Sequence, residues 1–215
     1  MNKSLFFDLD GTLWDALIPL TQSWNDAMEK AQKPFRFTLE KMKSYMGLTP
    51  VETVPLAFPG TALEEGLQLF HTVLTAEVLY LAQHPGKPYP SEEKILAMLS
   101  KEYPLYIVSN SGKGYVENYL KACHMAPYFQ GHICAGDTGK SKAENIRILK
   151  ERIGIEKVIY IGDTQKDKTE SEKAGVPFIH AAYGFGTIAP DPYRILSLSE
   201  LPPLVAKLFA SDDVF

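Results

Sequence analysis

The stretch Leu5-Phe6-Phe7-Asp8-Leu9-Asp10-Gly11-Thr12-Leu13 joins a short apolar run to two carboxylates and a glycine. The apolar run ends abruptly at Asp8, which is typical of a buried strand in a parallel sheet. Asp8 and Asp10 lie two positions apart, so both side chains face the same side if the backbone stays extended. Gly11 then permits a sharp turn. This stretch therefore predicts a buried strand that ends in a pair of carboxylates.

Short apolar segments of the same kind recur further along the chain, and stretches with helical periodicity separate them. The apolar segments cover residues 105–108, 131–134, 158–161 and 176–179. The helical stretches begin at Ser91 and continue at 113–123, 143–153 and 165–174. Because strands and helices alternate, we predict the α/β class, with a doubly wound parallel sheet as a Rossmann-type core.

The first strand interrupts this alternation, since about 80 residues separate it from the next helix–strand pair. That stretch contains no convincing strand, and its periodicity predicts helices at 18–31, 38–46 and 61–83. It closes in a proline-rich return at 84–90, where a helix cannot continue. We therefore predict an inserted all-helical domain at 16–85 and a core formed by 1–15 and 86–215.

Composition limits the classes of protein to which the chain can belong. Its 215 residues are 45% hydrophobic and 22% charged, as expected of an ordinary globule. The formal net charge is −4, which argues against a nucleic-acid partner that needs a broad basic face. The two cysteines form no disulfide framework, and no apolar run suggests a signal peptide or a membrane span. We expect a cytoplasmic protein without a membrane partner, as a monomer or homodimer.

Polar groups follow three of the predicted strands. Asp163 and Asp167 follow the segment 158–161, and Ser109 follows the segment 105–108. Because the carboxyl ends of parallel strands meet at one edge of a sheet, these groups are expected to lie near Asp8 and Asp10. Carboxylate oxygens suit Mg²⁺, and helix N-termini with hydroxyl groups suit phosphate. The pattern predicts a site for Mg²⁺ and a phosphate group.

These motifs resemble, in order, the four motifs of the haloacid dehalogenase (HAD) superfamily of phosphohydrolases. Residues 8–13 are similar to the first motif, Ser109-Asn110 to the second, Lys142 or Lys140 to the third, and residues 162–167 to the fourth. The segment 183–186 is similar to the corresponding segment of the phosphoglycolate-phosphatase-like branch, and the helical insertion resembles that branch's cap domain. The resemblance implies a Mg²⁺-dependent phosphatase that acts on small-molecule phosphate monoesters.

The resemblance also implies a role for each motif residue. Asp8 would attack phosphorus and form an aspartyl-phosphate, and Asp10 would protonate the leaving oxygen and later deprotonate water. Asp8, Asp163 and the backbone carbonyl of Asp10 would hold the metal, and Asp167 would support the lysine or the metal's waters. The residues implied to bind the phosphate group are Thr12, Ser109, Asn110 and Lys142.

Several choices remain open at the level of the sequence. We favour Lys142 over Lys140 as the phosphate-binding lysine, because it begins a helix at the spacing to Gly154 seen in related phosphatases. Among the aromatic residues in or beside the insertion, Trp14 is the best candidate to face the substrate. The basic residues Arg36, Lys41 and Lys43 are available for a second anionic group, but solvated surface is the default for each.

The residues also separate the related activities. Asp10 speaks against dehalogenation, because the dehalogenase branch lacks an acid at that place. A phosphomutase needs the same core and differs in how the cap excludes water, and a non-catalytic regulatory member keeps the fold alone. Phosphoglycolate, a sugar phosphate, a nucleotide and pyrophosphate all remain open as substrates.

Overall fold

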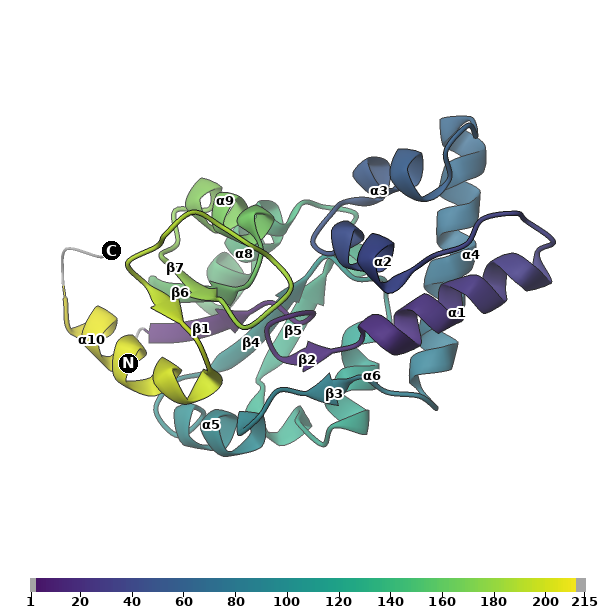
Figure 1. The fold of residues 1–215 in the computed structure, drawn as a ribbon. Helices are drawn as coiled ribbons and strands as arrows, with labels where there is room; N and C mark the ends of the chain where they lie inside the picture. The colour runs from purple at the N-terminus through teal and green to yellow at the C-terminus, as the bar shows by residue number, and fades with distance from the viewer. Residues whose placement is uncertain (1–2, 212–215) are drawn as a thin grey trace.

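A computed structural model describes residues 3–211 and contains a central parallel sheet of six strands (Figure 1). Strand β1 (Lys3–Phe7) lies inside the sheet between β4 and β6, with Leu5 paired to Leu105 and to Ile159. The predicted α/β fold is confirmed. The other strands in spatial order are β5 (Gly131–Cys134) and β4 (Leu105–Ser109) on one side of β1, and β6 (Lys157–Gly162), β7 (Phe178–Ala181) and β8 (Arg194–Ile195) on the other.

This strand order determines where a ligand can bind. The chain runs outward from β1 through β4 to β5, and then returns to the opposite side of β1 to form β6, β7 and β8. The order therefore reverses at β1, and in open α/β sheets ligands bind beyond the carboxyl ends of the strands at such a reversal. Asp8 directly follows β1, Ser109 ends β4, and Asp163 directly follows β6.

Alternating side chains of β1 contribute to two hydrophobic layers. Phe6 packs with Val108, Tyr160 and the helical residues Ile146 and Leu149 in one apolar cluster. Leu5 and Phe7 point to the other face, in the cluster that includes the helical residues Leu96, Val116 and Val205. Figure 1 shows the helices on both faces of the sheet. The core helices are α5 (Glu92–Leu99), α6 (Tyr115–Ala122), α7 (Ala135–Thr138), α8 (Lys142–Ile153), α9 (Gln165–Lys173) and α10 (Leu201–Ala210).

The predicted helical insertion lies beside the carboxyl ends of the strands (Figure 1). Trp24 is the centre of its small core, with its ring 5.1 Å from the ring of Phe37 and 5.8 Å from that of Phe70. The insertion contains α1 (Leu17–Lys30), α2 (Leu39–Tyr45), α3 (Pro50–Ala57) and α4 (Leu63–Leu81).

Helix α3 was not expected, because its prolines indicated a break in the chain. Pro50 occupies the start of the helix, where a missing N–H costs nothing. Thr49 and Glu52 form a reciprocal capping box around it: the Thr49 hydroxyl accepts from the Glu52 backbone N–H, and Glu52 accepts from the Thr49 backbone N–H. Pro50 therefore marks a helix start here and not an interruption.

The two passages between sheet and insertion pair with each other as a short antiparallel ribbon. Strand β2 (Trp14–Asp15) lies against β3 (Lys87–Pro88), which is part of the predicted proline-rich return. Strands of two residues, β8 included, are too short to show a periodicity in the sequence.

The domain limits at residues 15/16 and 85/86 stay a prediction. Among the described helices, none has the length and apolar character needed to cross a bilayer.

A buried carboxyl group beneath the sheet makes folding stability dependent on pH. Glu92 is almost fully buried and accepts a hydrogen bond of 2.5 Å from the Tyr119 hydroxyl. Burial raises the pKa of Glu92 to about 8 from an ordinary value of 4.5. The folded state therefore keeps a proton that the unfolded chain loses, and stability falls as the pH rises between these two values.

We predict that Glu92→Gln weakens this pH dependence, by up to about 1 kcal/mol per pH unit. The free energy of unfolding, measured by urea titration between pH 5 and pH 8, checks this. Glu93→Gln, which changes the neighbouring exposed carboxyl group, serves as the matched control and keeps the wild-type slope. Equal slopes for the Glu92 variant and the wild type would contradict the prediction.

Candidate active site

The side chains that follow the three central strands converge at one edge of the sheet. Asp8, Ser109 and Asp163 are all buried there, and Asp8 is held at its backbone by a 2.8 Å hydrogen bond from its N–H to the Ile161 carbonyl. Carboxylate oxygens of Asp8, Asp163 and Asp167 lie within 4.8 Å of one another. The structure thus brings together the groups that the sequence analysis expected to meet.

Lys142 joins two of these carboxylates. Its Nζ lies 2.6 Å from Asp8 Oδ1 and 2.5 Å from Asp167 Oδ1, and its side chain is 1% exposed. Burial alone would lower the pKa of Lys142, but the negative charges of Asp167 and Asp8 outweigh burial and raise it well above its ordinary value. Lys140, the alternative, is about half exposed and lies 3.7 Å from Glu144. Of the two lysines, Lys142 is the one within reach of Asp8.

Asp167 is held by its own helix terminus as well as by the lysine. Its Oδ2 accepts hydrogen bonds from the Thr164 backbone N–H at 3.0 Å and from the Thr164 hydroxyl at 2.6 Å. The Thr164 hydroxyl in turn accepts from the Asp167 backbone N–H at 3.1 Å, which completes the capping box of α9 and fixes Asp167 relative to β6. Gly162 is required beside it, because a Cβ at that position would lie 2.7 Å from the Cβ of Asp167. Both oxygens of Asp167 thus accept hydrogen bonds: Oδ1 from Lys142, and Oδ2 from Thr164.

Asp163 has one engaged and one unengaged oxygen. Its Oδ2 accepts from the backbone N–H groups of Phe185 at 2.6 Å and Gly186 at 3.1 Å. Its Oδ1 is buried and has no hydrogen-bond partner among the described residues. Burial, followed by the charge of Asp167, raises the pKa of Asp163 to about 7. A buried carboxylate in this state fits a site for a hard cation.

The loop at 183–186, which the sequence analysis noted only for its resemblance, makes a specific contact with the site. Its backbone N–H groups hold Asp163, a function that no side chain in the loop signals in the sequence. The turn at Gly11 packs against the same carboxylate. Gly11 has a φ of +83°, and a Cβ there would lie 2.3 Å from Asp163 Oδ2. Only glycine fits this conformation and this close approach.

Asp10 points toward the aromatic residues beside the sheet. Its Oδ1 accepts hydrogen bonds from the Tyr115 hydroxyl at 2.7 Å and from Trp14 Nε1 at 3.1 Å. Burial raises the pKa of Asp10 to about 6. Trp14, expected to face the substrate, is fully buried and lies outside the cavity lining, so that expectation was wrong. It orients Asp10 instead.

Two of the residues expected to bind phosphate have other contacts. Thr12 is buried outside the cavity lining, and its backbone carbonyl accepts a hydrogen bond of 2.7 Å from the Tyr183 hydroxyl. Asn110 lines the cavity, but its amide donates to the Gly47 carbonyl of the insertion at 3.0 Å. Ser111, which the sequence analysis did not single out, also lines the cavity and has a buried hydroxyl without a partner among the described residues.

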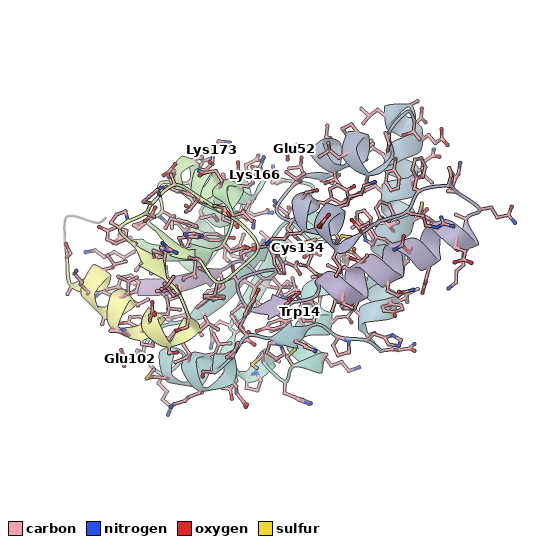
Figure 2. All side chains as sticks on the ribbon, viewed as in Figure 1. Trp14, Glu52, Glu102, Cys134, Lys166 and Lys173 are labelled. Carbon is pink, nitrogen blue, oxygen red and sulfur yellow. The ribbon has the colours of Figure 1, made fainter. Side chains whose placement is uncertain are left out.

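The helical insertion closes over this edge of the sheet. Glu52 on α3 forms an ion pair with Lys166 on α9 at 2.8 Å, and Figure 2 shows the two labelled side chains next to each other. Asn118 on α6 donates to the Val78 carbonyl on α4 at 2.6 Å. A cavity of about 90 Å³ lies between the two parts. The core residues lining it are Asp8, Asp10, Ser109, Asn110, Ser111, Tyr115 and Lys142.

Comparison with known proteins identifies the family. A family model described as haloacid dehalogenase-like hydrolase matches residues 5–181. The chain belongs to this family. The prediction of a HAD-type hydrolase is thereby confirmed, and we refer to the helical insertion, α1–α4, as the cap.

Curated relatives of this HAD-like hydrolase are distant but nearly full-length. It is 28% identical over 192 residues to the phosphoglycolate phosphatase of Aquifex aeolicus, covering 85% of this chain and 86% of the relative. The phosphoglycolate phosphatase of Escherichia coli is 24% identical over 213 residues, covering 85% and 82%. A solved haloacid dehalogenase-like hydrolase from Streptococcus pneumoniae shares the fold, with a TM-score of 0.78 and 22% identity over 96% of this chain and 97% of that one.

We predict that Lys142→Met destabilises the protein far more than Lys140→Met. Without Lys142, two buried carboxylates lose their common partner, which costs about 3 kcal/mol or more of unfolding free energy. Lys140 forms a single exposed ion pair, so its loss changes stability by less than about 1 kcal/mol. Urea unfolding of both variants at neutral pH measures the difference. Equal losses would show that Lys142 does not have the predicted stabilising role.

Proposed function

We propose that the protein is a Mg²⁺-dependent phosphatase that hydrolyses small phosphate monoesters through an aspartyl-phosphate on Asp8. One observation carries the proposal: the Asp8 carboxylate lines a cavity between the core and the cap, beside a buried lysine and a second carboxylate with a free oxygen. A nucleophile, a positive charge and a potential metal ligand are thus within reach of one phosphoryl group. The activity for which the curated relatives are named, phosphoglycolate phosphatase, supports the same reaction class.

In the first step, Asp8 attacks phosphorus and the bond to the leaving oxygen breaks. Asp10 donates a proton to that oxygen. The hydrogen bonds from Tyr115 and Trp14 orient the Asp10 carboxyl group, and a pKa of about 6 keeps its protonated form accessible near neutral pH. In the second step, the Asp10 carboxylate takes a proton from water, which attacks phosphorus and releases phosphate from Asp8.

The acidic residues fit a divalent cation. Asp8, Asp163 and the backbone carbonyl of Asp10 would hold Mg²⁺, and the partnerless buried Oδ1 of Asp163 is the observation that favours this assignment. When bound, Mg²⁺ supplies positive charge that reduces the repulsion between the Asp8 carboxylate and the phosphate. Asp167 is better suited to restraining Lys142, because both of its oxygens already accept hydrogen bonds.

The remaining phosphate contacts come from the core. Ser109 lies at the end of β4, and its hydroxyl oxygen accepts a 3.1 Å hydrogen bond from the Ser111 backbone N–H, which leaves the hydroxyl proton free to donate. Lys142 contributes a fixed positive charge beside Asp8. Both groups are held before the substrate binds, so they stabilise the transferring phosphoryl group with little reorganisation.

We predict that Asp8→Asn lowers kcat for phosphate release by at least about 10³-fold, because an amide cannot act as the nucleophile. The assay measures phosphate release from a panel of monoesters in the presence of Mg²⁺. Asp15→Asn, at an exposed carboxyl on β2, is the control and keeps the wild-type rate. Unchanged hydrolysis by the Asp8 variant would disprove the proposal, and isomerisation of a sugar phosphate without phosphate release would favour the phosphomutase. No turnover with any ester would favour a non-catalytic regulatory or binding member.

We also predict that Asp163→Asn weakens Mg²⁺ binding by more than about tenfold, since even groups that only contact metal ligands change affinity by this much. Titration calorimetry with Mg²⁺ alone measures the effect without substrate. Asp191→Asn, which alters a carboxylate paired with Lys168, is the control. Equal Mg²⁺ affinities for the wild type and the Asp163 variant would remove Asp163 from the metal site.

A further inference from the structure

The cap side of the cavity is apolar and contains no cation. Lys142 is the one basic side chain among the described residues that line the cavity, and both Asp8 and Asp167 already contact it. Arg36, Lys41 and Lys43, the basic residues considered for a second anion, are exposed and lie outside the lining. The cap residues with apolar or aromatic side chains in the lining are Leu20, Trp24, Met42, Tyr45, Met46, Leu48, Phe70 and Leu74.

One carboxyl group interrupts this apolar surface. Glu77 lies on α4, is 5% exposed, and accepts a hydrogen bond of 2.9 Å from Trp24 Nε1 through Oε2. Burial raises the pKa of Glu77 to about 8, against the opposing effect of the Trp24 hydrogen bond. At neutral pH the group is therefore mostly an uncharged carboxyl with a proton to donate.

The size of the cavity limits the leaving group. A volume of about 90 Å³ is that of roughly three water molecules in the liquid. The phosphoryl group next to Asp8 takes up much of this space and leaves room for a short carbon chain. A larger leaving group, such as a nucleoside, would extend out through the open side of the cavity.

The charges of the lining limit the leaving group further. A leaving group that carries a carboxylate would place a second negative charge in an apolar surface, near Glu77 and Asp10, without a free cationic side chain. A buried charge without a partner is strongly unfavourable. A hydroxyl group, in contrast, finds in Glu77 a partner that both donates and accepts.

We propose that the substrate is a phosphate monoester of a short, uncharged, hydroxylated carbon chain, whose hydroxyl group hydrogen-bonds to Glu77 while its carbon atoms contact Trp24 and Leu74. This inference rests on the proposed phosphatase function and narrows its substrate class. It also separates this protein from the activity named for its curated relatives, since phosphoglycolate carries the disfavoured carboxylate.

Three small esters of the same chain length test the inference on the wild-type protein. They are 2-hydroxyethyl phosphate, ethyl phosphate, which lacks the hydroxyl, and phosphoglycolate, which has a carboxylate in its place. We expect kcat/KM for 2-hydroxyethyl phosphate to exceed that for phosphoglycolate by at least about 100-fold, because an uncompensated buried charge has an effect of this size. We expect it to exceed that for ethyl phosphate by about tenfold, as for a net hydrogen bond.

Variants at Glu77 test the proposed contact itself. Glu77→Leu should raise KM for 2-hydroxyethyl phosphate about tenfold, with kcat changed little and with ethyl phosphate unaffected. Glu77→Gln keeps a donor and an acceptor and should restore most of the lost affinity. Glu92→Gln alters another buried carboxyl group, outside the cavity, and is the matched control that keeps the wild-type KM.

The outcomes separate this inference from the proposed function. Preferred hydrolysis of phosphoglycolate, or of esters much larger than the cavity, would overturn the inference and leave the phosphatase function intact. Equal kcat/KM values for ethyl and 2-hydroxyethyl phosphate would also overturn it, by removing Glu77 from recognition. Hydrolysis of no monoester in a broad panel would instead disprove the phosphatase function itself. The wild-type series decides the inference even if the Leu variant fails to fold.

Discussion

The buried contact of Lys142 with Asp8 and Asp167 is the interaction on which the site depends. These three charged side chains lie on β1's carboxyl end, the start of α8 and the first turn of α9, and all are nearly excluded from water. Charged groups tolerate such burial only when they are paired. Each element must therefore be in place for the others to be stable. Beside these ion pairs, Asp163 keeps a buried oxygen without a hydrogen-bond partner among the described residues, and this oxygen indicates where a cation fits.

The cap has its own centre in Trp24. This ring packs against aromatic residues from α2, α3 and α4 or the segments between them, and its N–H holds Glu77 at the cavity. The side chain that forms the core of the cap therefore also orients the group proposed to recognise the leaving group. Two further contacts join the cap to the core. Glu52 pairs with Lys166 at the surface, and the Asn110 amide donates to the Gly47 carbonyl at the cavity. Together these contacts hold the cap against the core beside the cavity.

Much of the fold was predictable because its signals are local. The strands at β1, β4, β5, β6 and β7 each appear in the sequence as an apolar run with a polar end, and the cap helices α1, α2 and α4 begin and end within two residues of their expected limits. The misses have physical reasons. Strands of two residues have no periodicity, and α3 begins at a proline whose helix-initiating role depends on the capping box around it. Trp14 was assigned to the substrate because of its place after Asp10, but the sequence does not reveal that its side chain turns inward.

By itself, the sequence determined which chemical groups follow each strand, and therefore which would meet, because the carboxyl ends of parallel strands necessarily share one edge of the sheet. Only the tertiary structure decided how those groups are used. The selection of Lys142 over Lys140, the backbone donors to Asp163 and the inward position of Glu77 all depend on contacts between residues far apart in the chain. A glutamate in an amphipathic helix ordinarily indicates a solvated surface. It becomes a group of the cavity because the cap folds over the sheet, and residue spacing along one helix carries no information about that packing.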